Sequence, residues 1–100
     1  MPIDLTIART IIEQLGGRFS MMTGAKNFVG NNTGVTFKIG GGAKNGINCV
    51  RITLTPMDDY TLEFMRIWGT KVKEISKIKG VYNDNLQKVF TAETGFDTNL

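Results

Sequence analysis

Two lysine-bearing segments carry the most suggestive chemistry in this chain. The tetrapeptide Gly-Ala-Lys-Asn occurs at residues 24–27 and again at 42–45, both times in glycine-rich, turn-like surroundings. A lysine beside unprotected backbone N–H groups can bind an oxygen anion such as a phosphate. Lys26, Asn27, Lys44 and Asn45 are therefore candidate phosphate-binding residues. Each segment also has a simpler interpretation, as a polar loop beside a strand that needs no ligand.

The second copy differs from a nucleotide-binding phosphate loop. The Walker pattern requires Gly-Lys followed by Ser or Thr at the start of a helix. Here Ala43 separates Gly42 from Lys44, Asn45 follows, and the next predicted element is a strand. The sequence therefore excludes a Walker-type site.

A second basic feature is the stretch from 71 to 79. The spacing of its apolar residues leaves strand and helix open, but glycines at both ends favour a short strand. In a strand, side chains alternate between faces, so one face would carry four lysines, at Lys71, Lys73, Lys77 and Lys79. Such a face would attract a phosphate backbone. Lysines also protect an edge strand from pairing with other chains, which is the competing interpretation.

Two aromatic residues flank this stretch. Trp68 precedes it and Tyr82 follows it. Exposed aromatic rings can stack on bases or anchor a protein interface. Both residues are therefore candidates for stacking or for protein contact, together with Met21 as a further protein anchor.

Catalytic and metal-binding groups are scarce. The chain has no histidine, which removes the commonest general base and zinc ligand. Cys49 is the single cysteine and is predicted to be a small buried hydrophobe in a strand. Asp58-Asp59 is the one adjacent carboxylate pair, in a predicted hairpin turn where aspartates make turn hydrogen bonds. We expect a protein that is not an enzyme and has no cofactor and no metal.

The bulk properties indicate one small domain. A chain of 100 residues with 41% apolar content can bury a core, and its net charge of +3 is compatible with an anionic partner. No apolar run approaches the length of a membrane span, and the first residues do not resemble a signal peptide. We expect a cytoplasmic protein.

The periodicities predict a helix, a meander of strands and a second helix. Helical spacing predicts the first helix, ending at Gly16-Gly17, and the last one, ending at Gly95. Alternation predicts strands over 35–39, 47–55 and from Tyr60 onward, the last two forming a hairpin, with a further short strand over 19–22. The expected fold class is α+β, with an antiparallel four- to five-stranded sheet in two layers.

The chain also resembles a family of small proteins encoded by bacteriophages, prophages and plasmids. The resemblance spans nearly the whole chain and rests on LGGxF (15–19), MTGAKNFV (22–29), AKNGIN (43–48), RITL (51–54), YxxEFxR (60–66) and FTxxTG (90–95). It implies a mobile-element origin and a soluble α+β fold. It carries no activity and assigns no role to any residue.

A protein of this size without catalytic groups is expected to act by binding. The leading hypothesis is a phage-type protein that engages a nucleic acid or a nucleotide, including a signalling nucleotide of host defence. The first alternative is a protein that inhibits a host defence enzyme, and the second is a structural or assembly component of the phage. A homo-oligomer is expected under each, because a two-layer domain leaves one sheet face uncovered.

Overall fold

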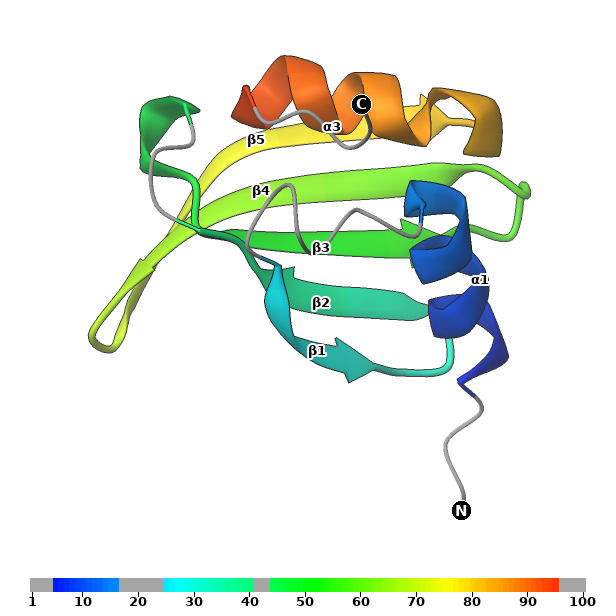
Figure 1. Ribbon diagram of the computed structural model, residues 1–100, viewed down its shortest axis with the longest axis horizontal. Helices are drawn as coiled ribbons and strands as arrows, with labels where there is room; N and C mark the ends of the chain where they lie inside the picture. The colour runs from blue at the N-terminus through cyan, green and yellow to red at the C-terminus, as the bar shows by residue number, and fades with distance from the viewer. Residues whose placement is uncertain (1–4, 17–24, 41–43, 96–100) are drawn as a thin grey trace.

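The computed structural model describes residues 5–16, 25–40 and 44–95, which form one antiparallel sheet and two helices (Figure 1). The five strands pair in chain order, so the sheet is a simple meander. The elements are α1 (Thr6–Leu15), β1 (Lys26–Gly30), β2 (Gly34–Lys38), η1 (Lys44–Gly46), β3 (Cys49–Leu54), β4 (Tyr60–Trp68), β5 (Lys71–Val81), η2 (Asn83–Asn85) and α3 (Leu86–Thr94). The predicted fold class, an α+β meander with a helix at each end, is confirmed.

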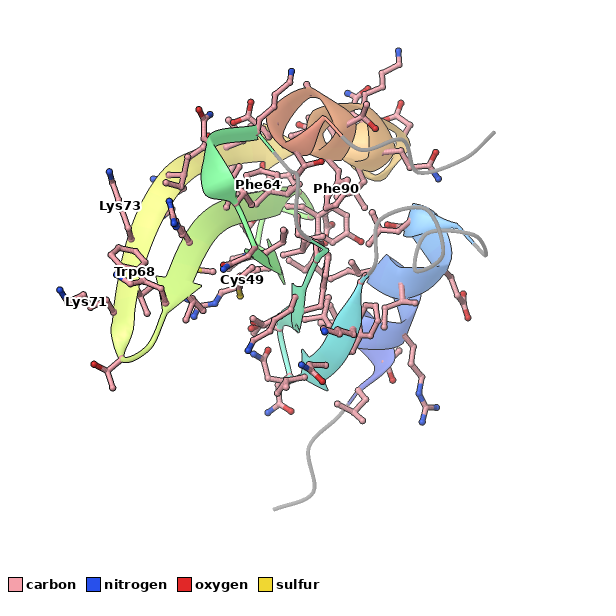
Figure 2. All side chains as sticks on the ribbon, turned by 60° about the vertical axis from the view of Figure 1, so that its left-hand side comes forward. Cys49, Phe64, Trp68, Lys71, Lys73 and Phe90 are labelled. Atoms are coloured by element: carbon pink, nitrogen blue, oxygen red, sulfur yellow. The ribbon has the colours of Figure 1, made fainter. Side chains whose placement is uncertain are left out.

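Both helices pack on the same face of the sheet, which we call the inner face. Alternate residues of the central strands point to it and are fully buried, as at Ile52, Leu62 and Phe64. Phe90 of α3 lies over them, with its ring centroid 6.3 Å from those of both Phe37 and Phe64. The core therefore lies between the sheet and the two helices. No helix of the described segments covers the opposite face, which we call the open face (Figures 1 and 2).

Polar side chains join the two helices to each other and to the sheet. The Gln87 amide donates to the carbonyl oxygens of Gln14 and Leu15, at 3.1 and 3.0 Å, and so pairs carbonyls at the end of α1. The Tyr60 hydroxyl donates to the Gln14 side chain over 3.0 Å. These bonds fix α3 beside α1 above the sheet.

Two sequence predictions concern the first third of the chain. The strand predicted over 19–22 lies outside the described residues. The Lys26-Asn27 segment was predicted as a loop, and this is wrong, because Lys26 begins β1 and pairs with Lys38 of β2. Gly30 ends β1 where α1 approaches closely: a Cβ there would lie 2.9 Å from that of Ala8.

The hairpin between β3 and β4 closes with the turn chemistry expected of its aspartates. Asp58 has a φ of 63°, in the left-handed region that Asp tolerates. The Asp59 carboxylate accepts a hydrogen bond from the Thr55 hydroxyl, and its carbonyl accepts one from the Thr55 amide over 2.8 Å. Both aspartates are thus explained by the turn.

Candidate functional site

Lys26 and Asn27 of the first Gly-Ala-Lys-Asn copy begin the edge strand β1. Lys26 lies opposite Lys38, whose neighbour Phe37 points into the core, so both lysines are on the open face. Asn27 follows with a φ of 57°, where the pairing with β2 is interrupted by an extra residue. Asparagine adopts this conformation more readily than most residues, so Asn27 supports a β-bulge.

Lys44 and Asn45 of the second copy belong to η1, which lies beside the end of α3. The Lys44 ammonium donates to the carbonyl oxygen of Ala92 over 3.3 Å. Asn45 and Gly46 have φ values of 59° and 73°. Lys44 therefore satisfies a carbonyl in the last turn of α3, a favourable place for a cation. Its ammonium lies on the helix side of the sheet, whereas Lys26 is on the open face, so the two copies do not form one site.

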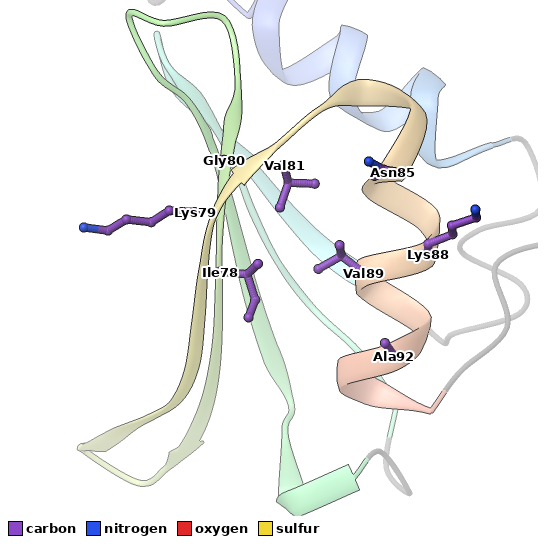
Figure 3. Close-up of a pocket in the computed structure, with 8 residues that line it drawn as sticks. All are labelled: Ile78, Lys79, Gly80, Val81, Asn85, Lys88, Val89 and Ala92. Carbon is purple, nitrogen blue, oxygen red and sulfur yellow. The ribbon is translucent and has the colours of Figure 1, made fainter.

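The four lysines of β5 do not share a face, which corrects the sequence prediction. Glu74 pairs with Met65 and Ser76 with Phe64, so Ile75 is an extra residue on β5. Such a bulge reverses the alternation of side chains. Lys77 consequently lies opposite Glu63 on the open face, and Lys79 points away from α3 (Figure 3).

The other two lysines lie on the inner side of a hairpin that projects beyond the helices (Figure 2). Lys73 pairs with Arg66 and Lys71 pairs with Trp68, across a two-residue turn. The Arg66 guanidinium lies over the Trp68 ring, 5.5 Å from its centroid. We call these four residues, Arg66, Trp68, Lys71 and Lys73, the arm patch.

The arm patch concentrates positive charge around an accessible ring. Trp68 is 45% exposed, and the three cations are exposed as well. The nearest carboxylate on β5, that of Glu74, lies opposite Met65 and so on the other face. Like charges placed directly opposite on a sheet destabilise it, as for Arg66 and Lys73. An anion bound between them would relieve this repulsion.

A side-chain amide holds the base of the arm, because it pairs with backbone groups as a neighbouring strand would. The Asn48 side chain donates to the carbonyl of Ile67 and accepts from its amide, both at 2.8 Å. Gly46 of η1 packs on Arg66 so closely that a Cβ there would lie 3.1 Å from a guanidinium nitrogen. The residues that follow the second tetrapeptide, Gly46 and Asn48, thus position the base of the arm patch.

The cations of the open face are arranged differently. Arg51 lies 3.8 Å from the Glu63 carboxylate, and Glu63 pairs with Lys77 on its other side. None of the described strand residues that point to this face is aromatic. Lys26 and Lys38 also lie opposite each other on this face, but no aromatic ring of the described strands lies beside them. The open face therefore lacks the combination of paired cations and an exposed ring that the arm patch has.

Trp68 and Tyr82 do not belong to one surface. Tyr82 is 56% exposed but follows the far end of β5. The ten residue steps from Lys71 to Val81 correspond to about 33 Å of extended strand. Tyr82 is therefore separate from the arm patch, and Met21 lies outside the described residues.

Cys49 behaves as the sequence predicted. It is buried on the open side of β3, and burial raises the pKa of its thiol above the ordinary 9.0, against the opposing effect of Arg51 and Lys38. A protonated, inaccessible thiol is a poor nucleophile. In the described segments no three His, Cys, Asp or Glu residues are grouped to hold a metal ion.

Arg66 is the one member of the arm patch that sequence reasoning missed. The available signal was the segment Trp68-Gly69-Thr70-Lys71, which can form a two-residue hairpin turn with Gly69 at positive φ. That turn pairs Trp68 with Lys71 and therefore Arg66 with Lys73. The sequence prediction used Gly69 only as the glycine that precedes a short strand over 71–79, so it did not include the pairing of Arg66 with Lys73.

Comparisons with known proteins give no match, so the function is inferred from the geometry of the arm patch. The chain matches no protein-family model, no curated protein and no solved structure. Within the segments described, no helix has the length and apolar character required to cross a membrane.

Proposed function

We propose that this protein acts by binding, and that the arm patch engages single-stranded nucleic acid. The observation that carries the proposal is the half-exposed Trp68 ring with a guanidinium over it and two lysines opposite on the same face. Every base presents a face that can stack on an aromatic ring, while cations bind the phosphates between bases. No catalytic step is part of this function.

The arrangement favours a single strand over a duplex. A ring at the tip of a narrow hairpin can reach an unstacked base, whereas bases inside a duplex are stacked on each other. A free nucleotide, including a signalling nucleotide of host defence, carries the same base and phosphate groups. It is a smaller ligand that would use the same contacts. A phage-type role in the cytoplasm of a host cell is part of the proposal.

A second candidate function is inhibition of a host protein. Trp68 is exposed and lies beside Arg66, and tryptophan and arginine are both enriched at energetically important interface positions. Salt separates the two functions, because phosphate binding by several cations weakens steeply with added salt. An interface anchored by Trp68 would change little.

The experiment measures binding of a fluorescently labelled oligothymidylate by polarisation at several salt concentrations. The double variant Lys71→Ala/Lys73→Ala removes two charges from the arm patch. The double variant Lys77→Ala/Lys79→Ala is the matched control, since it removes the same charge from the same strand but on the other face.

We expect the arm variant to lose at least about tenfold in affinity. Its salt slope should fall by about 1.4, since each phosphate contact on a single strand contributes about 0.7. The control variant should lose less and keep most of the slope. Equal losses in the two variants, or no binding by the natural protein, would contradict the proposal.

A further inference from the structure

A second surface lies at the opposite end of β5, where two hollows share residues of this strand. The first, about 450 Å³, lies between β5 and α3, and Ile78, Val81 and Val89 point into it (Figure 3). The second, about 620 Å³, lies beside the β3–β4 turn and is lined by Thr55, Pro56 and Met57. Both hollows include Lys79 and Gly80, so they meet at one position of the strand.

That position lies on a free edge. β5 is the last strand in the sheet order, so within the described residues no strand pairs with its outer side. An unpaired edge presents backbone N–H and C=O groups that another extended chain can pair with. Gly80 has a φ of 72° in a bulge of β5 opposite Thr61, and nothing stands within 4 Å of where its side chain would begin, so the face of the strand is open at this position.

The two hollows match the geometry of an added strand. Successive side chains of a strand point to opposite faces of the sheet. A peptide paired with β5 near Gly80 would therefore direct one side chain toward α3 and the next toward the β3–β4 turn. Each hollow has an apolar floor, which favours apolar side chains at these two adjacent positions.

The positive charge around the two hollows indicates that the rest of the peptide is acidic. Lys77 and Lys79 lie along the strand, and Lys88 of α3 lines the first hollow. The carboxylate that lines the second hollow, that of Asp59, already accepts a hydrogen bond from Thr55. Acidic residues beside the apolar pair would meet these lysines. A second copy of β5 would instead bring lysines close to lysines, which is unfavourable.

We propose that this edge takes an extended acidic peptide by β-strand addition, with two adjacent apolar side chains seated in the two hollows. The peptide belongs to a protein partner and binds independently of the arm patch, which lies on the far end of β5. The surface gives the protein two separate ligands, a phosphate-bearing chain at one end and a peptide at the other.

A random heptapeptide library tests the inference without assuming a sequence. Immobilised protein selects binders in parallel with the variant Ala92→Trp, whose indole fills the hollow beside α3 from an exposed helix position. We expect enriched peptides with two adjacent apolar residues flanked by Asp or Glu, depleted by at least about tenfold on the variant. Backbone amide NMR should place their contacts at residues 77–81 and along α3.

Two further measurements test the backbone pairing and the charge contacts separately. A selected peptide with N-methylated backbone amides keeps its side chains but loses the donors that pair with β5, and should bind at least about tenfold more weakly. The variant Lys79→Glu should weaken binding, whereas Lys71→Glu, the same change on the arm, should not. Three outcomes would overturn the proposal: no enrichment that depends on Ala92, equal binding of the methylated peptide, or a dimer formed through this edge.

Discussion

The Lys44 ammonium donates to the carbonyl oxygen of Ala92 over 3.3 Å and so closes the last turn of α3. The Lys44 stem also packs on Gly95, where a Cβ would lie 3.3 Å from its Cγ. One lysine of the doubled tetrapeptide therefore has a structural partner, and its charge complements the negative end of the helix.

Replacing Lys44 should lower stability without affecting ligand binding. We expect Lys44→Met, which keeps the aliphatic stem, to lower the free energy of unfolding by about 0.3–1 kcal/mol. Urea denaturation measures the change, and Lys26→Met is the matched control with no helix end beside it. An oligonucleotide affinity reduced tenfold by Lys44→Met would contradict the structural role.

The asparagine of each tetrapeptide should be replaceable by glycine but not by alanine. Asn27 and Asn45 have φ values of 57° and 59°, where an ordinary L-residue is strained. Asn45→Ala should cost about 1 kcal/mol of stability, whereas Asn45→Gly should be close to neutral. Thermal unfolding of the paired variants checks this, and equal effects of Ala and Gly would refute a conformational role.

Gly34 should be among the least replaceable residues of the sheet. A Cβ there would lie 2.0 Å from the carbonyl oxygen of Ile52, which is backbone and cannot rotate away. We expect Gly34→Ala to cost more than about 2 kcal/mol, measured by urea denaturation. Gly69→Asn is the control, because Gly69 has an open environment and a φ of 59° that Asn tolerates. An unchanged stability of Gly34→Ala would mean that β2 and β3 lie further apart.

Stability should decline at alkaline pH through two buried groups. Burial raises the pKa of the Cys49 thiol above 9.0 and that of the Tyr60 hydroxyl above 10.0. The unfolded chain then loses these protons before the folded one, so stability is intact below pH 9 and falls as pH rises through the folded pKa values. In Cys49→Ala the decline should start about one pH unit later. An identical pH profile for that variant would contradict the assignment.

The sequence predicted the fold more completely than the site. Alternation around Ile52 and Leu62 was sufficient to predict the central hairpin, because one face of each strand is buried and the other is not. The lysine strand was also predicted, but not its bulge at Ile75: the three-residue spacing of Val72, Ile75 and Ile78 departs from strand alternation without showing which residue is the extra one. That one residue moves two lysines to the open face and two to the arm.

The doubled tetrapeptide shows why local motifs can mislead. Both copies place their asparagine at positive φ, so the repeat reflects a shared backbone requirement. One copy then leads into a strand and the other into a turn that supports Arg66. Tertiary context, which the sequence does not display, decides what each lysine contacts.

The most direct test of the proposed function uses the intrinsic fluorescence of Trp68, the one tryptophan in the chain. Titration with unlabelled oligothymidylate should quench the emission as bases stack on the ring, and Arg66→Ala or added salt should shift the titration to higher oligonucleotide concentration. Inorganic polyphosphate, which has no bases, should compete without causing the same quenching. An emission that stays constant while the oligonucleotide binds, or no binding at low salt, would contradict recognition at the arm patch.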